Sequence, residues 1–180
     1  MLKKDYEFGP IPDFTSLICV RVFTEKTEKR KLGKVKIRRT PVGFVFVRNP
    51  REHGLNALWK AAGGGPEGKE TPLETAVREL HEETNIEVQA AECRYEGRWL
   101  ASSGDHWKCL FSVNLPEERI ASMNSKHPGN DGEVPKLFRI DKLLRVVRHH
   151  HFMDEHYAKI VDAGLLLPGP AQEAAIEIAA

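Results

Sequence analysis

The segment Gly64–Ile86, which reads GGPEGKETPLETAVRELHEETNI, decides how the rest of this chain can fold. Its second half predicts a helix with a well-marked start. Thr71 can cap this helix, Pro72 suits its first position, and Glu74 completes a T-x-x-E capping box. Asn85 is predicted to be a left-handed C-cap. Residues at three- and four-residue spacing predict one core-facing stripe, made of Leu73, Ala76, Val77, Leu80 and Thr84.

The side of the helix opposite this stripe is predicted to be acidic. At about 100° per residue, Glu79 and Glu83 lie on neighbouring edges of that side, with Glu82 within reach of both. Each like-charged pair costs roughly 0.2–0.5 kcal/mol on an exposed helix. Arg78 can offset part of this by pairing with Glu82 or Glu74, and a divalent cation would offset more. A solvated acidic face is the alternative interpretation.

The spacing of these charges resembles the Nudix box, G-x5-E-x7-R-E-U-x-E-E-x-G-U, where U is a bulky aliphatic residue. Eight of its nine specified positions match between Gly64 and Ile86, and Asn85 stands where the Nudix hydrolase family has Gly. This departure is mild, because Asn is the next best residue in left-handed backbone. A second departure lies just upstream, where family members commonly have Pro-Gly-Gly and this chain has Ala62-Gly63-Gly64.

This resemblance implies an α+β fold, the Nudix-type α/β/α sandwich around a mixed β-sheet, as a single domain over residues 1–180. It also implies Mg²⁺ or Mn²⁺ as cofactor. Arg78 would orient the carboxylates through paired hydrogen bonds, and Glu82 would be a ligand or a base. The metal would be held by box carboxylates and a carbonyl of the glycine turn, namely Glu79, Glu83, Glu82, Glu70 and either Gly63 or Gly64.

The general base and the substrate contacts lie outside the box. Glu133 is the best-placed base, with Glu117 and Glu118 as weaker candidates, and a solvated residue at a strand start is the alternative interpretation for Glu133. Aromatic and basic side chains could stack a nucleobase or contact phosphates, although ordinary packing would explain each one singly. The candidates for these substrate contacts are Trp59, Lys60, Arg98 and Trp107.

Strand and helix patterns surround the box. The predicted strands are Ser16–Thr24, Val35–Arg48, Leu58–Ala61, Ile86–Leu100 with a bulge at Gly97, His106–Leu115 and Glu133–Ile140. The predicted connections are a lead-in over 1–14, a polar turn over 24–34, loops over 49–56 and 116–132, and a tail over 168–180. Asp141 is predicted to cap a helix through Leu144–His151 that continues over 152–163. Three consecutive histidines, His149 to His151, point in different directions on a helix and are not expected to chelate one ion.

Composition narrows the classes of function. The chain has 180 residues, 41% of them hydrophobic and 29% charged, with a net charge of +1. This balance argues against nucleic acid as a partner and against an anionic membrane surface. No apolar run approaches the roughly 18 residues that span a bilayer. Three scattered cysteines form no metal pattern and suit a reducing cytoplasm.

The function predicted from the resemblance is metal-dependent hydrolysis of a diphosphate linkage. Water would attack phosphorus in a nucleoside diphosphate derivative, such as a nucleoside triphosphate or a nucleotide sugar. The partner is therefore a small nucleotide, and a homodimer is compatible with the pattern. Two alternatives remain, a non-catalytic nucleotide-sensing module and an RNA 5′-end pyrophosphohydrolase. Retention of Glu70, Glu79, Glu82 and Glu83 favours the enzyme over the sensing module.

Overall fold

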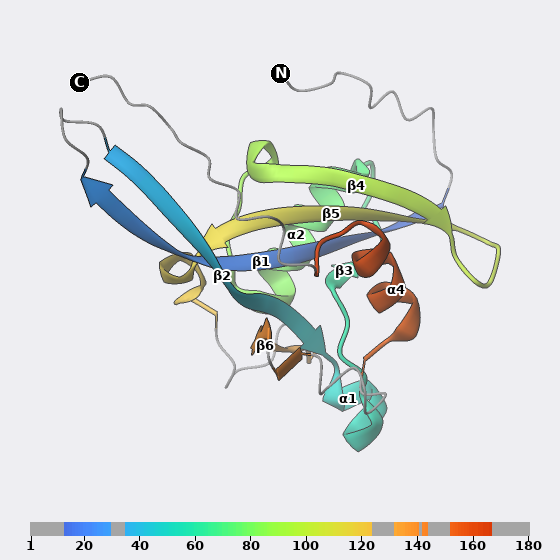
Figure 1. The fold of residues 1–180 in the computed structure, drawn as a ribbon. Helices are drawn as coiled ribbons and strands as arrows, with labels where there is room; N and C mark the ends of the chain where they lie inside the picture. The colour runs from blue at the N-terminus through green and yellow to red at the C-terminus, as the bar shows by residue number, and fades with distance from the viewer. Residues whose placement is uncertain (1–12, 30–34, 124–131, 141, 144–151, 167–180) are drawn as a thin grey trace.

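The fold is built on one mixed β-sheet with helices on both of its faces (Figure 1). The computed structural model describes residues 13–29, 35–123, 132–140, 142–143 and 152–166. Within these residues, six strands form the sheet in the order β4-β5-β1-β2-β6, and β3 pairs with β1. None of the described helices is long and apolar enough to cross a membrane. The predicted α+β architecture around a mixed sheet is confirmed.

The first strand, β1 (Phe14–Lys29), is the centre of this sheet. It pairs antiparallel with β2 (Val35–Arg48) and β3 (Ala62–Gly64), and parallel with β5 (Trp107–Pro116). The last two strands close the two edges, with β4 (Cys93–Leu100) on β5 and β6 (Val134–Arg139) on β2. The bulge predicted at Gly97 is confirmed, because the β4–β5 register shifts between Tyr95 and Gly97.

Two apolar layers cover the two faces of the sheet. Helix α2 (Pro72–Thr84) packs Ala76 and Leu80 against the face that carries Ile18, Val20 and Val45. Helix α4 (Asp154–Asp162) lies on the other face, where Ile160 and Phe152 belong to a cluster with Leu17, Phe46 and Trp59. Residues of opposite parity along the same strands therefore feed two separate cores.

Helix α2 begins and ends as its sequence predicts. The Thr71 side chain accepts a hydrogen bond from the Glu74 amide, the Glu74 carboxylate accepts one from the Thr71 amide, and Pro72 is the first helical residue. Asn85 closes the helix with φ of 59°, in the left-handed region. Ala76, Leu80 and Thr84 are buried, as the predicted stripe requires.

Several predicted boundaries are wrong in ways that reflect distant pairing. Strand β1 runs through Thr24 to Lys29 instead of ending in a polar turn, because Thr24–Lys29 pairs residue by residue with Val35–Thr40. The strand predicted over Leu58–Ala61 forms later, at Ala62–Gly64, where the missing glycine side chains allow close pairing with Ser16 and Leu17. Trp59 and Lys60 make only isolated bridges.

Other differences concern short helices. The loop predicted over 49–56 contains α1 (Pro50–His53) and the 3-10 helix η1 (Gly54–Asn56). The strand predicted from Ile86 begins only at Cys93, after the 3-10 helix η2 (Ala90–Glu92), and η3 (Glu117–Ile120) opens the predicted 116–132 loop. Asp141, residues 144–151 and the 168–180 tail lie outside the described residues, as does most of the predicted 1–14 lead-in.

Candidate active site

Five glutamates form what we call the glutamate cluster: Glu70, Glu79, Glu82, Glu83 and Glu133. Arg78 lies at the centre of its more exposed end. Its Nε and Nη2 atoms lie 2.9 and 3.1 Å from the two Glu70 oxygens. Its Nη1 atom donates to Glu79 at 3.0 Å and to Glu82 at 2.8 Å, and its Nη2 also donates to the Gly65 carbonyl at 2.8 Å. One planar guanidinium thus holds three carboxylates and the turn before the helix, a geometry that a lysine could not reproduce.

Glu70 is fixed by more than Arg78. Its carboxylate also accepts hydrogen bonds from the Glu67 amide and the Thr75 hydroxyl. The hydrogen bonds from Arg78, followed by those from the Glu67 amide and Thr75, lower the pKa of Glu70 to about 2. The same ion pairs hold the pKa of Arg78 above its usual value. Both groups are therefore charged throughout the range in which an enzyme works.

Glu83 forms the buried end of the cluster. Its side chain is only 7% exposed, its Oε2 accepts from the Gly63 amide at 2.7 Å, and its Oε1 lies 3.3 Å from the Lys60 ammonium. Burial raises the pKa of Glu83 to about 7, against the opposing effects of Lys60 and the Gly63 amide. The charges of Glu133 and Glu79 raise it further. Lys60 and the Gly63 amide therefore do not fully offset the cost of burying the charge of this carboxylate.

Glu79 lies against the glycine strand. A Cβ atom on Gly64 would stand 2.5 Å from the Glu79 Oε1, so only glycine allows this carboxylate to approach the backbone so closely. Burial raises the pKa of Glu79 as well, with Arg78 acting in the opposite direction. The close approach brings the Glu79 carboxylate to Gly64, next to Gly63, whose amide holds Glu83.

Glu133, the residue before β6, reaches the buried end. It is 6% exposed, and its Oε1 accepts a hydrogen bond from the Asn49 amide group at 3.1 Å. Its Oε2 is buried and has no hydrogen-bond partner among the residues that the structure describes. Its charge acts on Glu83, so the structure brings together two carboxylates that lie far apart in sequence. A buried carboxylate oxygen of this kind could be satisfied by a bound cation or by a water molecule.

The donor set of this site fits a hard divalent cation. Carboxylate and carbonyl oxygens are the ligands that Mg²⁺ takes, and the Glu79 carboxylate lies against the Gly64 backbone. Within the described part of the chain, however, no three acidic, His or Cys side chains are already gathered around one point. Arg78, Lys60 and the Gly63 amide hold these oxygens instead. A cation would therefore have to replace some of these partners, Lys60 first.

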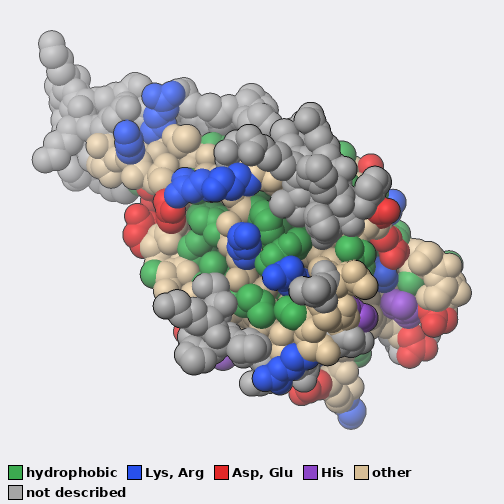
Figure 2. Space-filling view, turned by 90° about the horizontal axis from the view of Figure 1, so that it is seen from below, with side chains coloured by type: hydrophobic (Ala, Val, Ile, Leu, Met, Phe, Trp, Pro, Cys, Tyr) green, Lys and Arg blue, Asp and Glu red, His purple; other side chains and the backbone are tan. Residues whose placement is uncertain are grey.

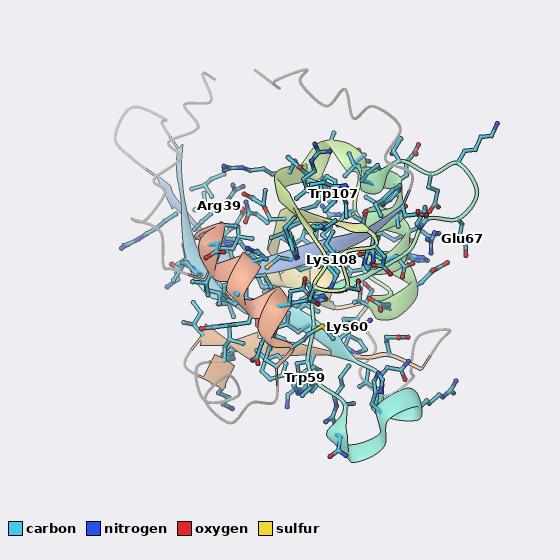
Figure 3. The ribbon with its side chains drawn as sticks, turned by 90° about the vertical axis from the view of Figure 1, so that its right-hand side faces the viewer. Arg39, Trp59, Lys60, Glu67, Trp107 and Lys108 are labelled. Atoms are coloured by element: carbon cyan, nitrogen blue, oxygen red, sulfur yellow. The ribbon has the colours of Figure 1, made fainter. Side chains whose placement is uncertain are left out.

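The candidate substrate residues lie in different surroundings. Lys60 is occupied by Glu83 and lies near the middle of the view in Figure 3, with Trp59 below it. Trp59 is 7% exposed, which leaves little ring surface for a nucleobase. Arg98 lies 4.9 Å from the centre of the Trp107 ring at the start of β5, and both belong to the β4–β5 hairpin. The structure thus brings Lys60 to the glutamates, whereas Arg98 and Trp107 lie against each other on the hairpin.

Three contacts of the site were not predicted from the sequence. They are those of Asn49 with Glu133, Thr75 with Glu70 and Lys60 with Glu83. The Asn49 amide positions Glu133 across 84 residues of sequence, and Lys60 pairs with Glu83 across 23. Contacts between residues so far apart in the sequence leave no local pattern from which they could be predicted. Thr75 could have been found, because it lies five residues after Glu70 and one turn before Glu79.

Comparisons with known proteins agree with this fold. A sequence model of the NUDIX domain matches residues 31–161. No match is found among curated protein sequences. The structure resembles that of a NUDIX hydrolase from Nitrosomonas europaea, with a TM-score of 0.53 and 17% identity, over 86% of this chain and 89% of that one.

Two further solved structures give similar values. The NUDIX domain of Shewanella oneidensis NrtR, complexed with ADP ribose, has a TM-score of 0.52 and 13% identity over 84% of this chain and 85% of that one. A NUDIX family hydrolase from Clostridium perfringens has a TM-score of 0.52 and 13% identity over 86% and 97%. Because the domain model matches most of its length, this chain belongs to the NUDIX domain family.

Proposed function

We propose that this protein hydrolyses a diphosphate linkage in a small nucleoside diphosphate derivative and that it needs Mg²⁺ or Mn²⁺ to do so. The observation that carries the proposal is the undercompensated buried end of the glutamate cluster. There Glu83 has a raised pKa, and Glu133 has a buried oxygen without a hydrogen-bond partner among the described residues. Buried carboxylates with such surroundings are typical of functional sites.

Each of these residues has a distinct part in the proposed reaction. Glu79, Glu83 and a carbonyl of Gly63 or Gly64 would hold the metal, with Glu82 and Glu70 supporting it. A bound Mg²⁺ or Mn²⁺ would neutralise charge on the diphosphate and lower the pKa of a bound water. Arg78 keeps the carboxylates oriented through its hydrogen bonds.

Glu133 is the proposed general base. Its Oε2 is the atom available to accept a proton from the attacking water, because the Asn49 amide occupies Oε1 and fixes the orientation of the carboxylate. Which phosphorus atom the water attacks depends on how the substrate lies in the site. Lys60, once released from Glu83, would carry its charge to the substrate phosphates.

A phosphate-release screen tests the proposal. Purified protein is incubated with nucleoside triphosphates, dinucleoside polyphosphates, nucleotide sugars, ADP ribose and 5′-triphosphorylated RNA, each with Mg²⁺ and with EDTA. Glu83→Gln is the matched variant, because it keeps the size of the side chain and removes its charge. We expect Mg²⁺-dependent turnover of one small-nucleotide class, reduced at least about 10²-fold in Glu83→Gln.

The other outcomes separate the alternatives. Tight binding of one nucleotide without turnover would overturn the hydrolase proposal in favour of a nucleotide-sensing module. Turnover of the RNA alone would move the substrate to RNA 5′ ends. Turnover that persists unchanged in Glu83→Gln would mean that the glutamate cluster is not the catalytic centre.

A further inference from the structure

Two cations share one buried aromatic ring beside the candidate active site. The guanidinium carbon of Arg48 lies 4.8 Å from the centre of the Trp59 ring, and the Lys136 ammonium lies 5.8 Å from the same centre. Lys136 is also 5.2 Å from the centre of the Phe138 ring, which meets Trp59 edge-on at 4.7 Å. We refer to Arg48, Lys136, Trp59 and Phe138 as the cation–aromatic cluster.

The charges of this cluster are not compensated. No carboxylate of the described residues forms an ion pair with Arg48 or Lys136, although most other cations near the site have one. The Arg48 Nε is buried and finds no acceptor in the described part of the chain. Aromatic rings stabilise cations, but they do not remove the repulsion between two of them. An anion bound between the two side chains would.

The cluster lies directly behind the buried end of the glutamate cluster. An isolated bridge joins Val47 to Lys60, so two extended segments run side by side here. In each segment one residue belongs to the cluster and the next serves the glutamates. Arg48 is followed by Asn49, which holds Glu133, and Trp59 is followed by Lys60, which holds Glu83.

The side of the molecule that carries β6 exposes one of the two cations and part of the other. Figure 2 shows it from below, with Lys and Arg side chains lying among hydrophobic ones. Lys136 is exposed, and Arg48 is half-buried, whereas Trp59 and Phe138 are almost fully buried. The rings therefore serve as a support for the two cations, and the charged groups are the part that a ligand can reach.

We propose that Arg48 and Lys136 form an anion subsite for a phosphate group of the substrate other than the one that is attacked. This inference rests on the proposed function because it assumes a phosphorylated substrate, but its test measures binding alone and needs no hydrolysis. Arginine suits phosphate because it can donate two parallel hydrogen bonds, and lysine adds a flexible point charge. The subsite would favour substrates that carry phosphate beyond the cleaved linkage over those that carry a neutral group there.

The test is calorimetric titration with inorganic tripolyphosphate in the presence of EDTA, where no hydrolysis occurs. Lys136→Met and Arg48→Met are compared with Arg39→Met, a matched control whose partner Glu25 lies on the distant β1–β2 ribbon. We expect each cluster variant to bind tripolyphosphate about tenfold more weakly, because a charge-assisted hydrogen bond is lost, and Arg39→Met to bind as the parent does.

Fluorescence supplies a second readout at the same place. Trp59 lies beneath both cations, so tripolyphosphate should change the tryptophan emission, and Trp59→Phe should abolish most of that change. Lys136 is exposed, so its substitution leaves the core intact even if Arg48→Met does not fold. Equal binding by all variants, or no binding by the parent protein, would overturn the subsite.

The two proposals can fail separately. The titration contains EDTA, so its result does not depend on the metal-dependent hydrolysis that the screen measures. If the screen finds no hydrolysis but binding still depends on Arg48 and Lys136, only the proposed function fails. If hydrolysis is found and binding ignores both residues, only the subsite fails.

Discussion

The two ends of the glutamate cluster differ in how their charge is compensated. At the exposed end, Arg78 gives Glu70, Glu79 and Glu82 hydrogen bonds of 2.8 to 3.1 Å, and the pKa of Glu70 falls to about 2. At the buried end, Glu83 has one lysine at 3.3 Å and one amide, and its pKa rises to about 7. Helix α2 thus carries an ion-pair network around Arg78. One turn further on, the charge of Glu83 is only partly compensated, and a bound metal ion could complete its compensation.

The largest expected effect comes from removing the buried charge. The folded-state pKa of Glu83 lies above its ordinary value of 4.5, so folding favours the protonated form. The stability linked to Glu83 is therefore fully present below pH 4.5 and is lost as the pH rises through 7. Glu83→Gln has no such loss. In metal-free buffer, its stability relative to the parent should increase by about 3 kcal/mol between pH 4.5 and 8.5, measured by urea unfolding.

Glu70→Gln is the matched variant at the exposed end and should show the opposite sign. Because the pKa of Glu70 is lowered, its stabilising effect is present above pH 4.5 and fades only as the pH falls toward 2. Glu70→Gln should therefore be less stable than the parent at neutral pH and approach it near pH 2. If both variants shift in the same direction with pH, the contrast between the two ends is wrong.

A smaller effect is expected from Arg78→Lys, which weakens the exposed end without removing its charge. One ammonium cannot donate to Glu70, Glu79, Glu82 and the Gly65 carbonyl at once. We expect a loss of about 2 kcal/mol in the free energy of unfolding at pH 7. The pKa of Glu70, followed by NMR titration, should move back toward 4.5, whereas that of Glu83 should change little. An unchanged Glu70 titration would contradict the role given to Arg78.

The smallest expected effect is at Asn85, the C-cap of α2, which belongs to neither end of the glutamate cluster. Asn85 has φ of 59°, and its side chain donates to the Ser122 carbonyl at 3.2 Å. Asn85→Ala should cost about 1–2 kcal/mol because alanine is strained in left-handed backbone. Asn85→Gly relieves the strain but loses the hydrogen bond, so it should stay within about 0.5 kcal/mol of the parent in thermal unfolding. Equal losses in both variants would show that the Ser122 contact, not the backbone, fixes this position.

The sequence predicted what depends on neighbouring residues. The capping box, Pro72 at the first helical position and the Asn85 C-cap are local patterns, and all three are confirmed. Of the predicted stripe, Ala76, Leu80 and Thr84 are buried, whereas Leu73 and Val77 are half-buried. The pairing of Arg78 with Glu82 follows from a spacing of four residues and is confirmed too, whereas the predicted alternative, Glu74, is used by Thr71. The family resemblance supplied the mixed sheet, which periodicity alone did not specify.

What the sequence could not supply depends on contacts across the fold. The extension of β1 to Lys29 depends on its partner β2, and the position of β3 depends on a close approach to Ser16 and Leu17. The surroundings of Glu83 come from Lys60 and Glu133, which are brought together only by the sheet. The metal, base and substrate roles assigned to site residues stay predictions that the variants above address.

The parallel pairing of β1 with β5 has a consequence for how the molecule folds. Residues 14–23 must find residues 107–116, so the central ladder closes a loop of the kind that slows folding. Helix α2 and its Arg78 network are local and can form early. Glu133 joins only when β6 adds to the edge of β2, near the end of the described sheet. We therefore expect the contacts of the exposed end to form before those of the buried end, which depend on pairing between strands that are distant in sequence.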